Sequence, residues 1–104
     1  MGKSSLEKVT NGHSWGNPAY SKLPDGTLFE WGAVTVPSNV YTYEINLPVE
    51  VTSLAQCSIA LTPLQTDTDY NVDFAGSTNT TIKIGRKPYT VANTYYWFLA
   101  GRWK

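Results

Sequence analysis

The sequence has few of the residues that build disulfides, metal centres and nucleophilic active sites. Its 104 residues include one cysteine and one histidine. Cys57 can form no disulfide within the chain, and no cysteine cluster exists to bind zinc. We interpret Cys57 as a small buried apolar residue, and the lack of disulfides fits synthesis in a cytoplasm. His13 lies in the polar lead-in, where nothing would hold it rigidly beside a serine or Cys57, so we expect no catalytic residues, no metal site and no cofactor.

Charge of one sign and long apolar runs are also missing. The chain has 8 basic and 8 acidic residues and a formal net charge of zero. A nucleic-acid-binding protein would show a basic patch, so we expect no nucleic-acid partner. No apolar run reaches the roughly 18 residues of a membrane span, so we expect no membrane insertion. The first residues lack the apolar segment of a signal peptide.

Side chains with carboxylate or amide oxygens occupy every second position from Asp67 to Asp73, in a pattern that partly matches a calcium-binding loop. The match fails where Val72 replaces the glycine of the sharp turn and Thr78 replaces the bidentate glutamate. A solvated strand face explains the same alternation. Paired carboxylates of a glycoside hydrolase are a minor alternative, because such pairs come from distant strands and a chain this short leaves little room for a cleft. The candidates for that pair are Glu30, Glu44, Asp67, Asp69 and Asp73.

Short runs with the period of a β-strand are present along most of the chain. Turn residues separate them, and no helical period is visible after residue 10, apart from room for one turn within residues 49–56. Leu23-Pro24-Asp25-Gly26 has the residues of a tight turn. The pattern predicts an all-β fold, a small antiparallel β-sandwich over residues 20–104, preceded by a flexible lead-in over residues 1–19. The expected strands are 27–36, 40–47, 56–62, 70–74, 80–84 and a last one from residue 94.

The last strand has two apolar faces. Tyr95, Trp97, Leu99 and Trp103 would share one face, and Tyr96, Phe98 and Ala100 the other. A sheet that covers a core on one side normally shows a polar second side. We therefore expect the second face to pack against another copy of the chain or a partner.

Aromatic residues make up 13% of the chain and include 4 tryptophans. Such a content is typical of β-folds and of surfaces that bind sugars or proteins. We assign most of one set to the core, namely Tyr41, Tyr43, Phe29, Trp31, Phe74 and Trp97. A second set lies at strand ends or in loops and is the better candidate for exposed contacts: Tyr20, Tyr89, Trp15 and Trp103.

Two segments carry a resemblance to a known family. Residues 20–32, YSKLPDGTLFEWG, resemble the opening of the C-terminal domain of phage tail-fibre proteins, in which a Lys-Leu-Pro-Asn/Asp-Gly turn precedes a strand ending in Gln-Trp-Gly. Residues 96–102, YWFLAGR, look like the closing aromatic-x-Trp-x-Ala-x-Gly strand of that family. Glu30 stands where glutamine is usual, and Ala100 adjoins Gly101. Residues 40–93 match only in the rhythm of their strands.

The resemblance implies a receptor-binding domain at the tip of a tail fibre. Such a domain would be part of a virion, follow a fibre shaft, assemble as a homotrimer and bind a bacterial surface receptor, often a polysaccharide, without catalysis. For the trimer interface we predict Tyr96, Phe98 and Trp103. For the ligand we predict Asp67, Asp69, Arg86, Tyr89 and Asn93.

Three other functions remain as alternatives. The chain could be a structural virion piece, such as a baseplate decoration, that binds no glycan. It could be a carbohydrate-binding module of a larger enzyme, which would usually be a monomer. It could also be the small hydrolase considered above, although fold resemblance alone decides none of these functions.

Overall fold

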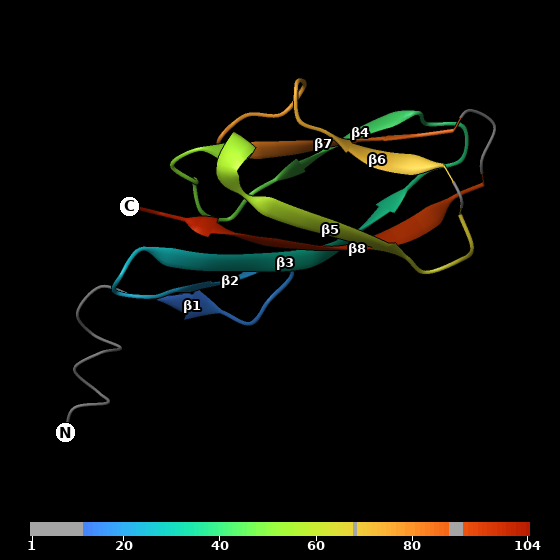
Figure 1. Ribbon diagram of the computed structural model, residues 1–104. Coiled ribbons are helices and arrows are strands. Elements are labelled where there is room, and N and C mark those ends of the chain that lie inside the picture. The colour runs from blue at the N-terminus through green and yellow to red at the C-terminus, as the bar shows by residue number, and fades with distance from the viewer. Residues whose placement is uncertain (1–11, 68, 88–90) are drawn as a thin grey trace.

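The computed structural model describes residues 12–67, 69–87 and 91–104, and these form a sandwich of two antiparallel sheets (Figure 1). The five-stranded sheet has the order β1 (His13–Ser14), β2 (Ala19–Lys22), β3 (Thr27–Val36), β8 (Asn93–Arg102) and β5 (Ser58–Pro63). The three-stranded sheet has the order β4 (Thr42–Asn46), β7 (Thr81–Arg86) and β6 (Tyr70–Asp73). One short 3₁₀ helix, η1 (Leu54–Gln56), precedes β5. The predicted all-β sandwich is confirmed.

Each predicted strand is present, but several bounds differ. β4 begins at Thr42 and β5 at Ser58, two residues later than predicted, and β2 was not predicted as a strand. β7 continues through Gly85 to Arg86, whereas we expected the chain to leave the sheet at Gly85. Gly85 is paired with Thr42 on one side and Asn71 on the other, so its missing side chain does not interrupt the ladder. Strand β1 lies within residues 1–19, and the sheet therefore begins before the predicted boundary at residue 20. Residues 1–11 lie outside the described part.

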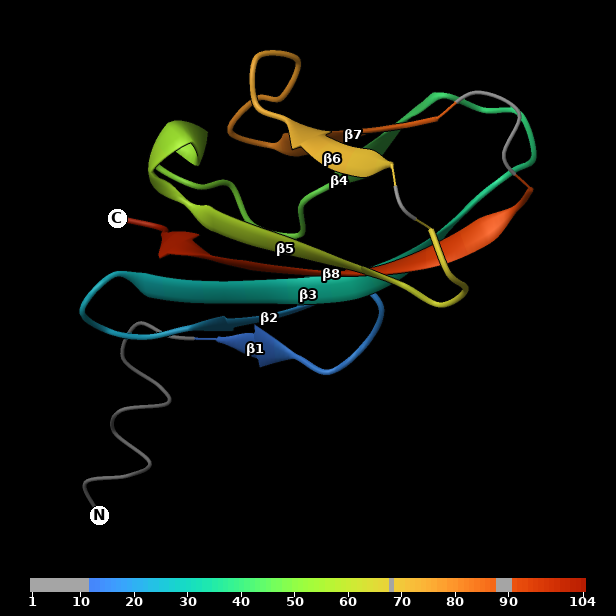
Figure 2. The same cartoon turned by 45° about the vertical axis from the view of Figure 1, so that its right-hand side comes forward.

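The centre of the five-stranded sheet is a ladder of ten residue pairs between β3 and β8. Strand alternation turns Tyr95, Trp97 and Leu99 towards the three-stranded sheet, and all three are buried. The two sheets face each other (Figure 2), and the core lies between them. Its fully buried members are Leu28, Val36, Ile45, Val51, Leu54, Ile82, Ile84, Tyr95, Trp97 and Leu99.

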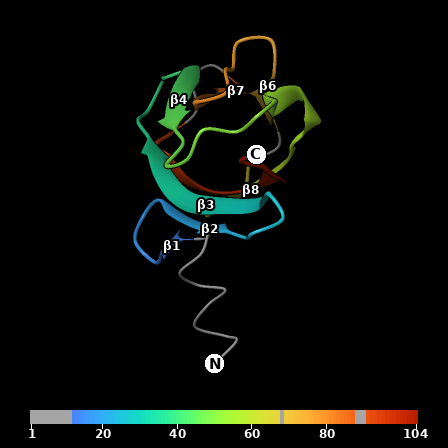
Figure 3. The same cartoon turned by 90° about the vertical axis from the view of Figure 1, so that its left-hand side faces the viewer.

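In the five-stranded sheet, β2 pairs with the edge of β3, and β1 pairs with β2. Seen from the end, both strands lie farther from the three-stranded sheet than β3 does (Figure 3). β2 pairs with β3 only as far as Trp31. Beyond that point the Asn17 side chain takes over the pairing: its Oδ1 accepts from the Ala33 amide at 2.9 Å, and its Nδ2 donates to the Ala33 carbonyl at 3.2 Å. A side chain at Gly32 would collide with this amide, because a Cβ there would lie 2.8 Å from Asn17 Oδ1.

The turn between β2 and β3 forms as predicted. Gly26 has φ of 99°, a conformation that glycine adopts without strain. Its amide donates to the Leu23 carbonyl at 3.1 Å. Asp25 Oδ1 accepts from the Thr27 amide at 2.8 Å, and these bonds from Thr27 lower the pKa of the Asp25 carboxyl.

Four aromatic residues that we assigned to the core lie elsewhere. Tyr41 is 46% exposed and Phe74 is 45% exposed, because both lie just outside the strands that contain their inward-facing neighbours. Phe29 and Trp31 are half-buried on the side of β3 opposite the core. The position that they were expected to occupy is taken by Glu30.

No described helix is long and apolar enough to cross a membrane.

Glu30 is a carboxyl group inside the core. Its side chain is fully buried, and Oε1 accepts a hydrogen bond from the Val49 amide at 2.8 Å. Oε2 has no hydrogen-bond partner among the described residues. Burial raises the pKa of this carboxyl to about 7, although the bond from Val49 opposes the shift. The charged form is therefore disfavoured in the folded protein.

Glu30 should make stability fall with rising pH, and Glu30→Gln should remove this dependence. The folded pKa of about 7 lies above the ordinary value of 4.5. The contribution of Glu30 to the free energy of unfolding is therefore complete below pH 4.5 and is lost as the pH rises towards 7 and above. The full difference is about 3 kcal/mol. Urea unfolding at several pH values measures it: the variant should match the wild type at pH 4 and exceed it at pH 8. A difference that does not change with pH would contradict this role of Glu30.

Candidate functional site

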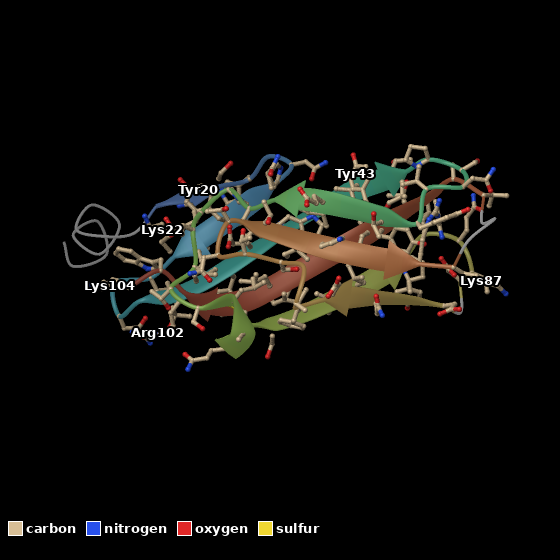
Figure 4. The ribbon with its side chains drawn as sticks, turned by 90° about the horizontal axis from the view of Figure 1, so that it is seen from above. Tyr20, Lys22, Tyr43, Lys87, Arg102 and Lys104 are labelled. Carbon is tan, nitrogen blue, oxygen red and sulfur yellow. The ribbon has the colours of Figure 1, made fainter. Side chains whose placement is uncertain are left out.

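Three loops meet at one end of the sandwich, where β3 ends and β8 begins. Their described residues are 37–41, 64–67 with 69, and 87 with 91–92, and this end is marked by Lys87 in Figure 4. The opposite end holds Lys22, Arg102 and Lys104, as the same view shows. We call the first the loop end. It contains the described ligand residues that the sequence predicted: Asp67, Asp69, Arg86 and Asn93.

Arg86 holds the loop end together from within. It is 8% exposed, and its guanidinium donates to the carbonyls of three residues in two loops. Nε donates to Val40 at 2.8 Å, Nη1 to Val91 at 3.0 Å, and Nη2 to Pro37. These bonds join the 37–41 loop to the segment that leads into β8. Arg86 is thus a structural residue, although one side of it also borders the groove described below.

Asp67 and Asn93 also make internal hydrogen bonds. The Tyr95 hydroxyl donates to Asp67 Oδ2, and burial together with this bond raises the pKa of the Tyr95 phenol, which remains protonated. Asn93 is 5% exposed, and its carboxamide bonds the backbone of Gln65 in both directions, each at 3.1 Å. Both residues fasten the 64–69 loop to β8.

Asp69 differs from its predicted partners because it is exposed. Its backbone amide donates to Asp67 Oδ1 at 3.3 Å and its carbonyl accepts from Lys87 at 3.0 Å. No hydrogen bond or ion pair to its carboxylate is found within the described part of the chain. Tyr89, the remaining predicted ligand residue, lies outside the described residues.

Asp69 borders a groove on the outer side of the three-stranded sheet, with a volume of about 260 Å³. The centre of the groove is Gly85, which lies between Thr42 of β4 and Asn71 of β6 in one row across the sheet. In the next row Lys83 occupies the corresponding place. The remaining lining residues are Tyr41, Tyr70 and Arg86. This groove could not be predicted from the sequence, because Thr42, Gly85 and Asn71 come together only when β4 and β6 pair with β7.

The outer face of the five-stranded sheet carries an apolar patch. Alternation places Phe29, Trp31, Tyr96 and Phe98 there, and we call these four residues the outer aromatic patch. Tyr96 is 48% exposed and Phe98 is 44% exposed. Phe29 stacks on Phe98 with ring centroids 5.8 Å apart. An open depression of about 700 Å³, lined by Trp31, Ala33, Tyr96 and Phe98 among others, lies over this patch.

Trp103 lies away from the other two predicted interface residues. It packs half-buried against the core near the end of the sandwich that holds Lys22, Arg102 and Lys104, which we call the terminal end. Its Nε1 donates to the Leu23 carbonyl at 2.8 Å. The ammonium groups of Lys22 and Lys104 lie 4.5 and 5.0 Å from its ring centroid. Trp15 instead extends the outer aromatic patch, since its ring centroid lies 5.9 Å from that of Trp31.

Within residues 12–67, 69–87 and 91–104, no group of three or more histidine, cysteine or acidic side chains is arranged to hold a metal ion. The five carboxylates considered for hydrolysis lie in three places. Glu30 is in the core, Glu44 and Asp73 flank Lys83 on the outer side of the three-stranded sheet, and Asp67 and Asp69 lie together at the loop end, where Asp67 bonds Tyr95.

Comparison with solved structures relates this fold to tail fibres. An N-truncated R2-type pyocin tail fibre aligns with 92% of this chain at 25% identity and a TM-score of 0.67. A C-terminal fragment of the R2 pyocin fibre of P. aeruginosa aligns with 90% of the chain, also at 25% identity and a TM-score of 0.67. These similarities support a tail-fibre domain.

A third tail-fibre fragment shares the fold at lower identity. The C-terminal fragment of the R1 pyocin fibre of P. aeruginosa aligns with 88% of the chain at 16% identity and a TM-score of 0.56. The chain spans 39%, 26% and 28% of these three fibre chains, respectively. No family model and no curated protein matches the sequence.

Arg86→Lys should destabilise this domain by about 2–4 kcal/mol, because an ammonium group cannot reach carbonyls that lie on three sides of a planar guanidinium. Urea unfolding at neutral pH measures the loss. Arg102→Lys is the matched control: Arg102 is exposed and donates to Asp25 and Lys104 carbonyls, so we expect a loss below about 1 kcal/mol. Equal losses in the two variants would show that Arg86 does not hold the loops together.

Proposed function

We propose that this domain attaches a tail fibre to a bacterial surface by binding a receptor, in particular a polysaccharide, as a homotrimer. In this proposal it belongs to a virion or a related particle, follows a fibre shaft, and acts by binding without catalysis. The observation that carries the proposal is the gathering of the three loops at the end away from the described termini. The similarity to pyocin tail fibres supports it.

The position of the termini favours the loop end as the receptor-facing end. The Gly12 carbonyl accepts from the Lys22 amide at 2.8 Å, and the Trp103 amide donates to the Gly26 carbonyl at 2.9 Å. Both described ends of the chain therefore lie beside the Leu23–Gly26 turn. The ten-residue strand β3 separates this turn from the loop end by about 30 Å. A shaft joined on the side of Gly12 leaves the loop end free.

The contrast between the two outer faces supports self-association. The outer side of the three-stranded sheet carries only polar residues and Gly85, as expected for a face in water: Thr42, Glu44, Asn46, Asn71, Asp73, Thr81, Lys83 and Gly85. The outer aromatic patch on the five-stranded sheet is instead apolar and partly exposed. Exposed apolar patches on small proteins mark interaction surfaces. Two neighbouring copies of this chain would cover it in the proposed trimer.

Binding to cells tests the proposal. Fluorescently labelled domain should bind saturably to some strains of a bacterial panel that starts with P. aeruginosa, the source of two similar fibres. Binding should survive protease treatment of the cells and be competed by polysaccharide extracted from them. Phe98→Asp should lower the apparent affinity at least tenfold, because a charge on the patch would separate the copies and remove avidity.

Phe74→Asp is the control, since Phe74 and Phe98 are almost equally exposed, at 45% and 44%. It should keep the wild-type affinity. Light scattering on the same samples should give three times 11.5 kDa for the wild type and Phe74→Asp, and one chain for Phe98→Asp. A monomeric wild type would contradict the trimer. Binding that protease treatment abolishes would contradict the polysaccharide receptor.

A further inference from the structure

We propose that the groove over Gly85 binds one neutral sugar unit of the receptor polysaccharide. This inference rests on the proposed function and specifies where on the domain the glycan lies and what kind of glycan it is. It concerns the outer side of the three-stranded sheet next to the loop end, and not the outer aromatic patch.

The absence of a side chain at Gly85 makes the groove. Its neighbours in the row, Thr42 and Asn71, both carry side chains that stand on the same outer face. A Cβ built on Gly85 would lie 3.0 Å from Asn71 Oδ1, so a larger side chain there would fill the space between them. Gly85 has an extended backbone that other residues adopt, so conformation does not require glycine here.

The groove offers free polar groups beside an exposed aromatic ring. Among the described residues, no side-chain hydrogen bond is made by Asp69 or Asn71. A carboxylate and a carboxamide together accept from and donate to sugar hydroxyls. Tyr41 is 46% exposed, and its ring presents an apolar face with a polar tip to a ligand. This combination suits a sugar ring, which has both hydroxyls and apolar C–H faces.

The charges around the groove favour a neutral sugar. Its lining contains one carboxylate, Asp69, and one guanidinium, Arg86. Arg86 donates to backbone carbonyls with Nε and both terminal nitrogens, so it is committed to the protein. The Asp69 carboxylate has no hydrogen-bond or ion-pair partner among the described residues, and it would repel an acidic sugar or a phosphate.

Backbone hydrogen bonds from Arg86 and the next residue, Lys87, also hold the groove in place. The Arg86 amide donates to the Tyr41 carbonyl at 2.8 Å, and the Lys87 amide donates to the Asp69 carbonyl at 3.0 Å. The backbones of Tyr41 and Asp69 are therefore fixed to the end of β7. Such preorganisation limits the entropy that a ligand must overcome.

A printed array of purified bacterial polysaccharides, probed with the whole labelled chain, tests the inference. The wild type should bind a subset of neutral polysaccharides. Gly85→Val should lose at least tenfold in signal on those spots, since its side chain would occupy the groove. Valine favours strands, so this variant should fold, and thermal unfolding checks that it does. Asn71→Ala should weaken the same spots without filling the groove.

Thr81→Val is the matched control, because Thr81 lies on the same face of β7 outside the groove lining. It should bind as the wild type does. Wild-type-like signals from both Gly85→Val and Asn71→Ala would overturn the groove assignment and leave the proposed function intact. A wild type that binds only acidic polysaccharides would overturn the neutral-sugar assignment. No binding by the wild type would overturn both the glycan receptor and the groove.

Discussion

The antiparallel pairing of β3 with β8 determines which side chains of these two strands face the core and which face outward. Its ten residue pairs run from the terminal turn to the loop end, so one register sets both faces of the five-stranded sheet. The side turned inward carries Tyr95, Trp97 and Leu99 and completes the core with the three-stranded sheet. The side turned outward carries the outer aromatic patch. A slip of one residue would exchange these two sets, which makes the register expensive to change.

The two ends of this ladder have different structures. At the terminal end a tight turn that contains Gly26 connects β2 to β3. At the loop end, long connections must be ordered by side chains, and Arg86, Asp67 and Asn93 do so through bonds to backbone groups or to Tyr95. Polar side chains that order these loops from inside leave their outer residues available to a ligand. In our proposal this division allows the loop end to bind a receptor while the sheets stay rigid.

The sequence predicted the elements whose alternation is clear and failed where a polar residue faces inward. The two faces of β8 were predicted correctly, because aromatic and aliphatic residues alternate there without a charge. Phe29 and Trp31 were assigned to the core as aromatic residues of a strand, but Glu30 between them is the residue that faces inward, and its burial raises the pKa of its carboxyl. Arg86 was predicted to bind ligand, although it continues the inward series of Ile82 and Ile84, a signal that was present. The groove over Gly85 could not be predicted, since it requires knowing that β4 and β6 flank β7.

In the proposed trimer, the outer aromatic patch is covered by other copies of the chain while the rest of the surface stays in water. Hydroxyl-radical footprinting with mass spectrometry tests it on two tyrosines of nearly equal exposure in the single chain, Tyr96 at 48% and Tyr41 at 46%. The account predicts that Tyr96 is strongly protected from oxidation in the native protein while Tyr41 reacts, and that both react equally after unfolding in urea. Equal oxidation of the two residues in the native protein would contradict it.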